Sequence, residues 1–212
     1  MRAIISDLDG VLMDSEKTKG LFWKEILGDY DVPDGEKWYA IHKGAPGPVL
    51  AARAVNEFRI KANPDLLTAK NRELHLTKLG DAEPIPNTIY FLKHLPKEVK
   101  LAVASSMYVS LIQKFVKQLG LEKRVEEIAS GADEVAHDKP APDVYQLAAK
   151  RLGVLPSECI VIEDSLSGVK AAKAAGMYCV GYAQQGSSLP ADIIISDFSG
   201  LSFADVCARL EK

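Results

Sequence analysis

The sequence has little of what marks secreted, zinc-binding or membrane-spanning proteins. It contains only three cysteines, Cys159, Cys179 and Cys207, and their spacing forms neither a CxxC pair nor a zinc site. We therefore expect buried thiols in a reducing compartment. No stretch approaches the roughly 20 apolar residues that span a bilayer. Asp7 and Asp9 interrupt the first apolar run before a signal peptide could form. These absences predict a cytoplasmic protein.

A strong net charge is also missing. The chain has 26 Lys and Arg residues against 29 Asp and Glu residues, which gives a formal net charge of −3. No overall field attracts nucleic acid or an anionic membrane, so we expect neither as a partner, and an anion site would need local positive charge. The 212 residues, 47% of them hydrophobic, fit one large globular domain or a core with a smaller insertion.

Short apolar runs recur along the chain, and several stop at polar residues or glycine. They cover residues 3–5, 101–104, 160–162, 178–180 and 193–195. Amphipathic helical patterns follow at residues 108–119, 143–152, 168–175 and 203–210. Buried strands that alternate with helices predict an α/β fold, a Rossmann-like doubly wound parallel sheet covered on both faces.

One segment interrupts this alternation. Between about residues 15 and 80 we find helical patterns and no convincing strand, with loop signals at 32–35, 44–48 and 63–64. Pro84 and Pro86 mark the return to the alternating pattern. The sequence therefore predicts a core domain of residues 1–14 and 82–212, with a helical domain of residues 15–81 inserted after the first strand.

Polar side chains cluster where the predicted strands end. They are Asp7 and Asp9 after the first strand, Ser105 and Ser106 after the second, Glu163 and Asp164 after the third, and Lys139 in a loop before a helix. In an open parallel sheet, ligands bind outside the carboxyl ends of the strands. Several carboxylates that face one another repel, so an oxygen-preferring cation such as Mg²⁺ is their natural partner.

These residue types fit phosphoryl transfer. Asp7 could attack phosphorus as a nucleophile. Asp9 could protonate the leaving oxygen and later activate water. Lys139 adds positive charge for phosphoryl oxygens, and Ser105 offers a hydroxyl donor to the same oxygens.

Each piece alone has a simpler structural explanation. Asp-Leu-Asp-Gly is often only a turn, the two serines could cap a helix, and Lys139 could be a solvated lysine. A calcium loop with Gly10 at its sixth position would place Ile5 at the first ligand position, where it cannot coordinate. The conjunction of these residues at successive strand ends outweighs the separate explanations.

That conjunction resembles the haloacid dehalogenase-like hydrolases over nearly the whole chain. The run from Asp7 to Val11 resembles their first motif, Ser105 their second and Lys139 their third. The pair Glu163-Asp164 resembles their acidic fourth motif, within a characteristic run at residues 162–177. The resemblance implies that Asp7 is the nucleophile and Asp9 the acid/base.

The resemblance also implies a cofactor and a second domain. Mg²⁺ would be bound by Asp7, the backbone carbonyl of Asp9 and Asp164, with Glu163 helping directly or through water. The inserted helices resemble a four-helix cap that closes over the substrate.

The branch of the family that the chain resembles most holds β-phosphoglucomutase, phosphoglycolate phosphatase and sugar-phosphate phosphatases. Asp9 favours phosphate esters, because relatives that cleave carbon–halogen bonds typically lack it. Lys19 stands where many relatives have His, and the loop at residues 41–48 lacks the Arg of the mutases. Both departures favour a phosphatase, with a phosphosugar mutase as the alternative. The candidate substrate-binding residues are Ser106, Lys19, His42, Lys43 and Gly44.

We therefore expect a Mg²⁺-dependent phosphoric monoester hydrolase that acts as a monomer on a small phosphorylated metabolite. A non-catalytic relative that binds phosphometabolites or proteins is a further alternative, because a fold alone does not determine function.

Overall fold

The computed structural model describes residues 1–42, 45–183 and 189–211. The chain divides into two compact units, residues 1–13 with 84–212 and residues 14–83. The division expected from the sequence lies one or two residues away, and the roles of core and cap stay predictions. No helix of the described segments is long and apolar enough to cross a membrane.

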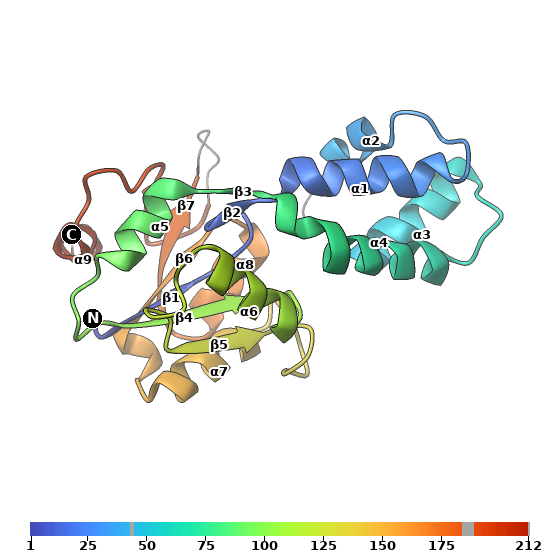
Figure 1. Ribbon diagram of the computed structural model, residues 1–212. Helices are drawn as coiled ribbons and strands as arrows, with labels where there is room; N and C mark the ends of the chain where they lie inside the picture. Colours follow the sequence, from blue (N-terminus) through green and yellow to red (C-terminus); the bar gives the residue numbers. More distant parts are fainter. Residues whose placement is uncertain (43–44, 184–188, 212) are drawn as a thin grey trace. The chain divides into compact units, whose positions relative to one another are not determined.

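The first unit is built on a six-stranded parallel sheet with the order β5-β4-β1-β6-β7-β8 (Figure 1). Its strands are β1 (Ala3–Ser6), β4 (Lys100–Ser105), β5 (Glu127–Ser130), β6 (Cys159–Glu163), β7 (Tyr178–Tyr182) and β8 (Ile193–Ile195). All five predicted apolar runs are strands. The remaining strand of this sheet, β5, was not predicted, because Ile128 and Ala129 are its only apolar residues.

Helices cover both faces of this sheet, as Figure 1 shows. They are α5 (Pro86–Lys93), α6 (Val109–Gln118), α7 (Asp143–Leu152), α8 (Leu166–Ala174) and α9 (Phe203–Leu210), with a short 3-10 helix η2 (Pro156–Glu158). Buried residues of α7 and α8, among them Val144 and Ala172, pack on Ile5 and Val161 of the central strands. The predicted doubly wound α/β fold is confirmed.

The second unit is helical. It contains α1 (Glu16–Gly28), α2 (Gly35–His42), α3 (Gly47–Phe58), α4 (Pro64–Lys78) and a 3-10 helix η1 (Leu79–Asp81). The sequence did not predict α2 as a separate helix. Its Trp38 packs against other aromatic side chains of this unit. The Trp38 ring lies 5.4 Å from Trp23 and 5.9 Å from Phe58 between centroids. Two short paired strands, β2 (Met13–Asp14) and β3 (Glu83–Pro84), lie at the boundary between the units.

The three cysteines are free thiols. Cys159 and Cys179 are buried, as expected, whereas Cys207 is half-buried. Burial raises the pKa of Cys159 to about 11 and that of Cys179 to about 12, so both stay protonated near neutral pH.

Candidate active site

The carboxyl ends of three neighbouring strands bring the predicted polar residues to one edge of the sheet. In the register of the sheet, Ser6 of β1 lies beside Val103 of β4 and Ile162 of β6. Asp7 follows β1 directly, Ser105 ends β4, and Glu163 ends β6. All three therefore gather at the edge where open α/β sheets bind ligands.

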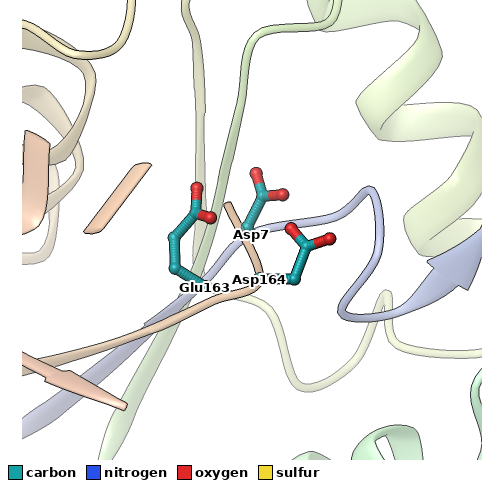
Figure 2. Close-up of side chains that lie close together, drawn as sticks. All are labelled: Asp7, Glu163 and Asp164. Atoms are coloured by element: carbon teal, nitrogen blue, oxygen red, sulfur yellow. The ribbon is translucent and has the colours of Figure 1, made fainter. Parts of the chain in front are cut away.

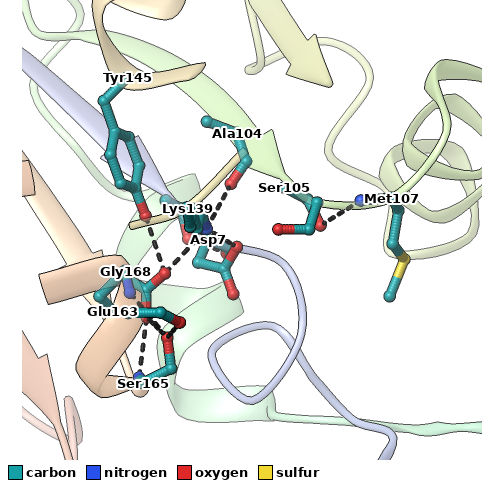
Figure 3. Close-up of polar contacts among 12 residues, drawn as sticks. Asp7, Ala104, Ser105, Met107, Lys139, Tyr145, Glu163, Ser165 and Gly168 are labelled. Atoms are coloured by element: carbon teal, nitrogen blue, oxygen red, sulfur yellow. Dashed lines mark hydrogen bonds and ion pairs between the residues drawn. The ribbon is translucent and has the colours of Figure 1, made fainter. Parts of the chain in front are cut away.

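Lys139 connects two of these strand ends. Its Nζ donates to Oδ1 of Asp7 at 2.7 Å and to Oε1 of Glu163 at 2.8 Å (Figure 3). The side chains of Lys139, Asp7 and Glu163 are 5%, 7% and 0% exposed. Charges this deeply buried need partners of opposite sign, and here each has one.

Four donors occupy the carboxylate of Glu163. Oε1 accepts from Lys139 and from the hydroxyl of Tyr145 at 2.9 Å. Oε2 accepts from the backbone N–H and the Oγ of Ser165, both at 2.8 Å. Gly168 permits this arrangement, because a Cβ there would lie 1.6 Å from Oε1 of Glu163. Ser165 is also the N-cap of α8, accepting from the N–H of Gly168 at 3.0 Å.

A third carboxylate completes the cluster. Oxygen atoms of Asp7, Glu163 and Asp164 all lie within 4.8 Å of one another (Figure 2). The loop after β1 makes room for Asp164 at Gly10, which has a φ of +83° and where a Cβ would lie 1.9 Å from Oδ2 of Asp164. One ammonium beside three carboxylates gives the cluster an excess of negative charge, so the residues present fit a divalent cation that prefers oxygen.

The protonation of the site reflects first its burial and then the charges of its neighbours. Burial raises the pKa of Asp7 from its usual 3.8 to about 7, and the charges of Glu163 and Asp9 add to the effect while Lys139 opposes it. Burial disfavours the ammonium of Lys139, but Asp7 and Glu163 outweigh it and hold the pKa of that lysine well above its usual value. Burial and Glu163 also raise the pKa of Tyr145, so its hydroxyl stays protonated and can donate.

The two serines of the second strand end differ in their contacts. Ser105 is 2% exposed, and its Oγ accepts from the N–H of Met107 at 3.3 Å. Ser106 is exposed, and its hydroxyl donates to Oδ1 of Asp138 at 2.9 Å. The same oxygen accepts the backbone N–H of Lys139 at 2.7 Å. Asp138 thus joins the loop of the serines to the loop of the lysine.

Asp9 lies in the turn after β1, where it forms an isolated bridge with Met13. Its side chain is partly exposed and is not one of the three clustered carboxylates. The metal contact expected of Asp9 concerned its backbone carbonyl, and that role, like its acid/base role, stays a prediction.

The candidate substrate-binding residues of the second unit have partners of their own. Nζ of Lys19 lies 3.5 Å from Oε1 of Glu16, one turn earlier in α1. Nδ1 of His42 lies 2.8 Å from the carbonyl oxygen of Trp38, and the two rings pack 4.6 Å apart. Lys43 and Gly44 lie outside the described residues. Substrate contact by these four residues and by Ser106 remains a prediction.

The sequence did not point to Tyr145 or Gly168 as site residues. Tyr145 lies on the apolar face of α7 beside Ala148 and Ala149, where it resembles any core tyrosine. One general signal was available, because a buried tyrosine hydroxyl usually needs a hydrogen-bond partner.

Known proteins resemble this chain over most of its length. A family model for haloacid dehalogenase-like hydrolases matches residues 1–176. The fructose-1-phosphate phosphatase YqaB of Escherichia coli is 32% identical over 178 residues, covering 84% of this chain and 94% of that protein. The β-phosphoglucomutase of Bacillus subtilis is 29% identical over 211 residues, covering 95% and 92% of the two chains.

A solved structure shows the same architecture. A CbbY variant from Rhodobacter sphaeroides, in complex with xylulose-(1,5)bisphosphate, has a TM-score of 0.75 at 25% identity and covers 97% of this chain and 98% of its own.

The parallel sheet carries a lysine and clustered carboxylates at its carboxyl edge, which is the edge at which open α/β sheets bind their ligands. The chain belongs to the haloacid dehalogenase-like hydrolases. The expected enzyme class, a phosphoric monoester hydrolase of this family, is confirmed by that membership together with its phosphatase relative.

Proposed function

We propose that this protein is a Mg²⁺-dependent phosphatase that hydrolyses a small phosphorylated metabolite through a phospho-aspartate on Asp7. The buried bridge of Lys139 carries the proposal. It engages Oδ1 of Asp7 and leaves Oδ2 without a hydrogen-bond partner among the described residues. A carboxylate held at one oxygen and free at the other is oriented for attack on phosphorus.

The chemistry takes two displacements. Oδ2 of Asp7 forms a bond to phosphorus as the ester P–O bond breaks, and Asp9 gives its proton to the leaving oxygen. Asp9 then takes a proton from the water that attacks phosphorus, the bond to Oδ2 breaks, and inorganic phosphate leaves. Lys139 keeps Oδ1 in place throughout, and the hydroxyl of Ser105 donates to a phosphoryl oxygen.

The residues present suit Mg²⁺. Asp7, Asp164 and the backbone carbonyl of Asp9 would bind it. Glu163 would take part through a water molecule, because four donors already occupy its carboxylate. When bound, the cation supplies positive charge to the phosphoryl oxygens.

The names of the similar proteins favour a sugar phosphate as the substrate class of this protein. One of them is named for fructose 1-phosphate, and another was solved with xylulose-(1,5)bisphosphate. We also propose that the enzyme is a cytoplasmic monomer. We propose that it has no nucleic-acid or membrane partner, in keeping with its net charge of −3. Light scattering on the purified chain tests the monomer.

The decisive experiment is a phosphate-release screen over sugar phosphates and other phosphorylated metabolites, with Mg²⁺ and with EDTA. We expect release with Mg²⁺, and loss of release with EDTA or in Asp7→Asn. Uncatalysed hydrolysis of phosphate monoesters is extremely slow, so even weak activity is measurable. The exposed variant Glu98→Gln is the matched control and should keep full activity. Undiminished turnover in Asp7→Asn would contradict the mechanism.

A phosphosugar mutase is the second candidate, because a β-phosphoglucomutase resembles the chain over 95% of its length. A mutase would move phosphate between hydroxyls of glucose without releasing inorganic phosphate. Tight binding of a phosphometabolite with neither reaction would indicate a non-catalytic relative.

A further inference from the structure

The hydroxyl of Tyr145 contacts the buried charge cluster, and the proposed chemistry gives this contact no role. Tyr145 lies in the first turn of α7 and is 0% exposed. Its hydroxyl donates to Oε1 of Glu163 at 2.9 Å, and Lys139 binds this same oxygen at 2.8 Å. Its ring also contacts the lysine, with Nζ 4.9 Å from the ring centroid (Figure 3).

We infer that Tyr145 is a positioning residue, whose hydroxyl sets the direction from which Lys139 approaches Glu163 and so holds the lysine on Asp7. The inference rests on the proposed function, because it concerns the orientation of the nucleophile.

Four donors occupy the acceptor sites of Glu163. A carboxylate oxygen has two lone pairs, and on Oε1 one is taken by Lys139 and the other by Tyr145. The other oxygen is filled by the two donors of Ser165. With the hydroxyl in place, only one direction on Oε1 is left to the ammonium, and that direction also brings Nζ to 2.7 Å from Oδ1 of Asp7.

Asp7 and Glu163 compete for the ammonium of Lys139, and the hydroxyl of Tyr145 weakens the pull of Glu163 by donating to it. Glu163 is fully buried, so each donor that it loses makes it a stronger competitor for Lys139. Without the hydroxyl, we expect Lys139 to move towards Glu163 and to loosen its contact with Asp7. Small errors in the placement of a reacting group cost large factors in rate.

Tyr145→Phe isolates this effect. The variant keeps the ring beneath the ammonium and removes only the hydroxyl. A hydrogen bond to a charged group typically contributes enough to change a rate by roughly one order of magnitude, so we expect kcat to fall about tenfold. KM should change less than twofold, because a residue without exposed surface does not touch the substrate. Tyr90→Phe, an exposed tyrosine of α5, is the matched control and should leave both constants unchanged.

A second measurement does not depend on turnover. Proton–nitrogen NMR tuned to lysine ammonium groups should show one slowly exchanging signal that is absent in Lys139→Met. That signal should shift in Tyr145→Phe and stay in place in Tyr90→Phe. In a Glu163→Gln background, Tyr145→Phe should lower kcat by less than about threefold, because residues that act through one another are not additive.

The outcomes separate the two proposals. If the wild type shows no turnover that depends on Asp7, the phosphatase proposal fails, and the ammonium signal still tests Tyr145. If turnover is present, an unchanged kcat in Tyr145→Phe overturns the inference. A raised KM at constant kcat, an unmoved ammonium signal, or full additivity with Glu163→Gln also overturns it.

Discussion

Lys139 and Asp7 form an ion pair of 2.7 Å between Nζ and Oδ1, with less than a tenth of either side chain exposed. Such a pair contributes little to stability when compared with apolar residues, because both ions lose their hydration. Its value here is geometric: it fixes one oxygen of the carboxylate. Removal of one partner strongly lowers the free energy of unfolding, because the other charge then stays buried without its partner.

Lys139→Met should therefore affect both stability and activity. Two buried carboxylates lose their shared cation, so we expect the free energy of unfolding to fall by about 3–5 kcal/mol and turnover to fall at least ~100-fold. Urea unfolding and steady-state kinetics measure the two effects. Lys173→Met is the control, because its pair with Asp192 is 43% and 29% exposed and should contribute at most about 1 kcal/mol. Equal destabilisation by the two substitutions would contradict the buried bridge.

Gly168→Ala tests the close packing around Glu163. The new Cβ would lie 1.6 Å from Oε1 and 1.9 Å from Cδ of a carboxylate that four hydrogen bonds hold in place. We expect a loss of about 1–3 kcal/mol from overpacking, although alanine is the better helix former, together with a lower kcat.

Gly28→Ala is the matched helical control for this substitution, because nothing lies within 4 Å of its Cβ position. It should be neutral or slightly stabilising by thermal unfolding. If Gly168→Ala is as stable and active as Gly28→Ala, the contact with Glu163 is not as close as the structure has it.

Much of the fold could be predicted because parallel strands buried on both faces leave a direct mark in the sequence. Residues 3–5 and 160–162 are uninterrupted apolar runs, and both are central strands. Strand β5 lies at the edge of the sheet and offers only Ile128 and Ala129, too little for the same signal. Helix α2 escaped prediction because its eight residues lie between two loop signals and begin with a glycine.

That the site residues meet at one edge of the sheet could be predicted for a related reason. Strands that run in parallel bring their carboxyl ends to one edge, so Asp7 and Glu163 were expected to meet, and they share a partner in Lys139. The contact of Tyr145 with Glu163 could not be predicted, because it depends on how α7 packs against the sheet. The pairing of charges could not be predicted either, because it depends on how deeply each group is buried and how far apart the groups lie in space. The spacing of residues along the chain determines neither the burial nor these distances.

The raised pKa of Asp7 predicts an unusual pH dependence of stability in the presence of EDTA. Burial raises this pKa from 3.8 to about 7, so between these pH values the folded protein keeps a proton that the unfolded chain has released. Stability falls with rising pH wherever the folded state binds more protons. The contribution of Asp7 should therefore be lost as pH rises from about 4 to about 7. At 1.36 kcal/mol per pKa unit, the loss is on the order of 4 kcal/mol.

Asp7→Asn should remove this dependence, because an amide does not ionise in that range. This variant should then gain stability relative to the wild type as pH rises from 4 to 8, measured by urea unfolding in EDTA. Glu98→Gln, at an exposed position, should follow the wild-type curve. Mg²⁺ should stabilise the wild type most at the upper end of this range, because a ligand that binds the folded state with ionised Asp7 favours that state by mass action. Parallel curves for Asp7→Asn and the wild type would show that Asp7 does not titrate as its burial requires.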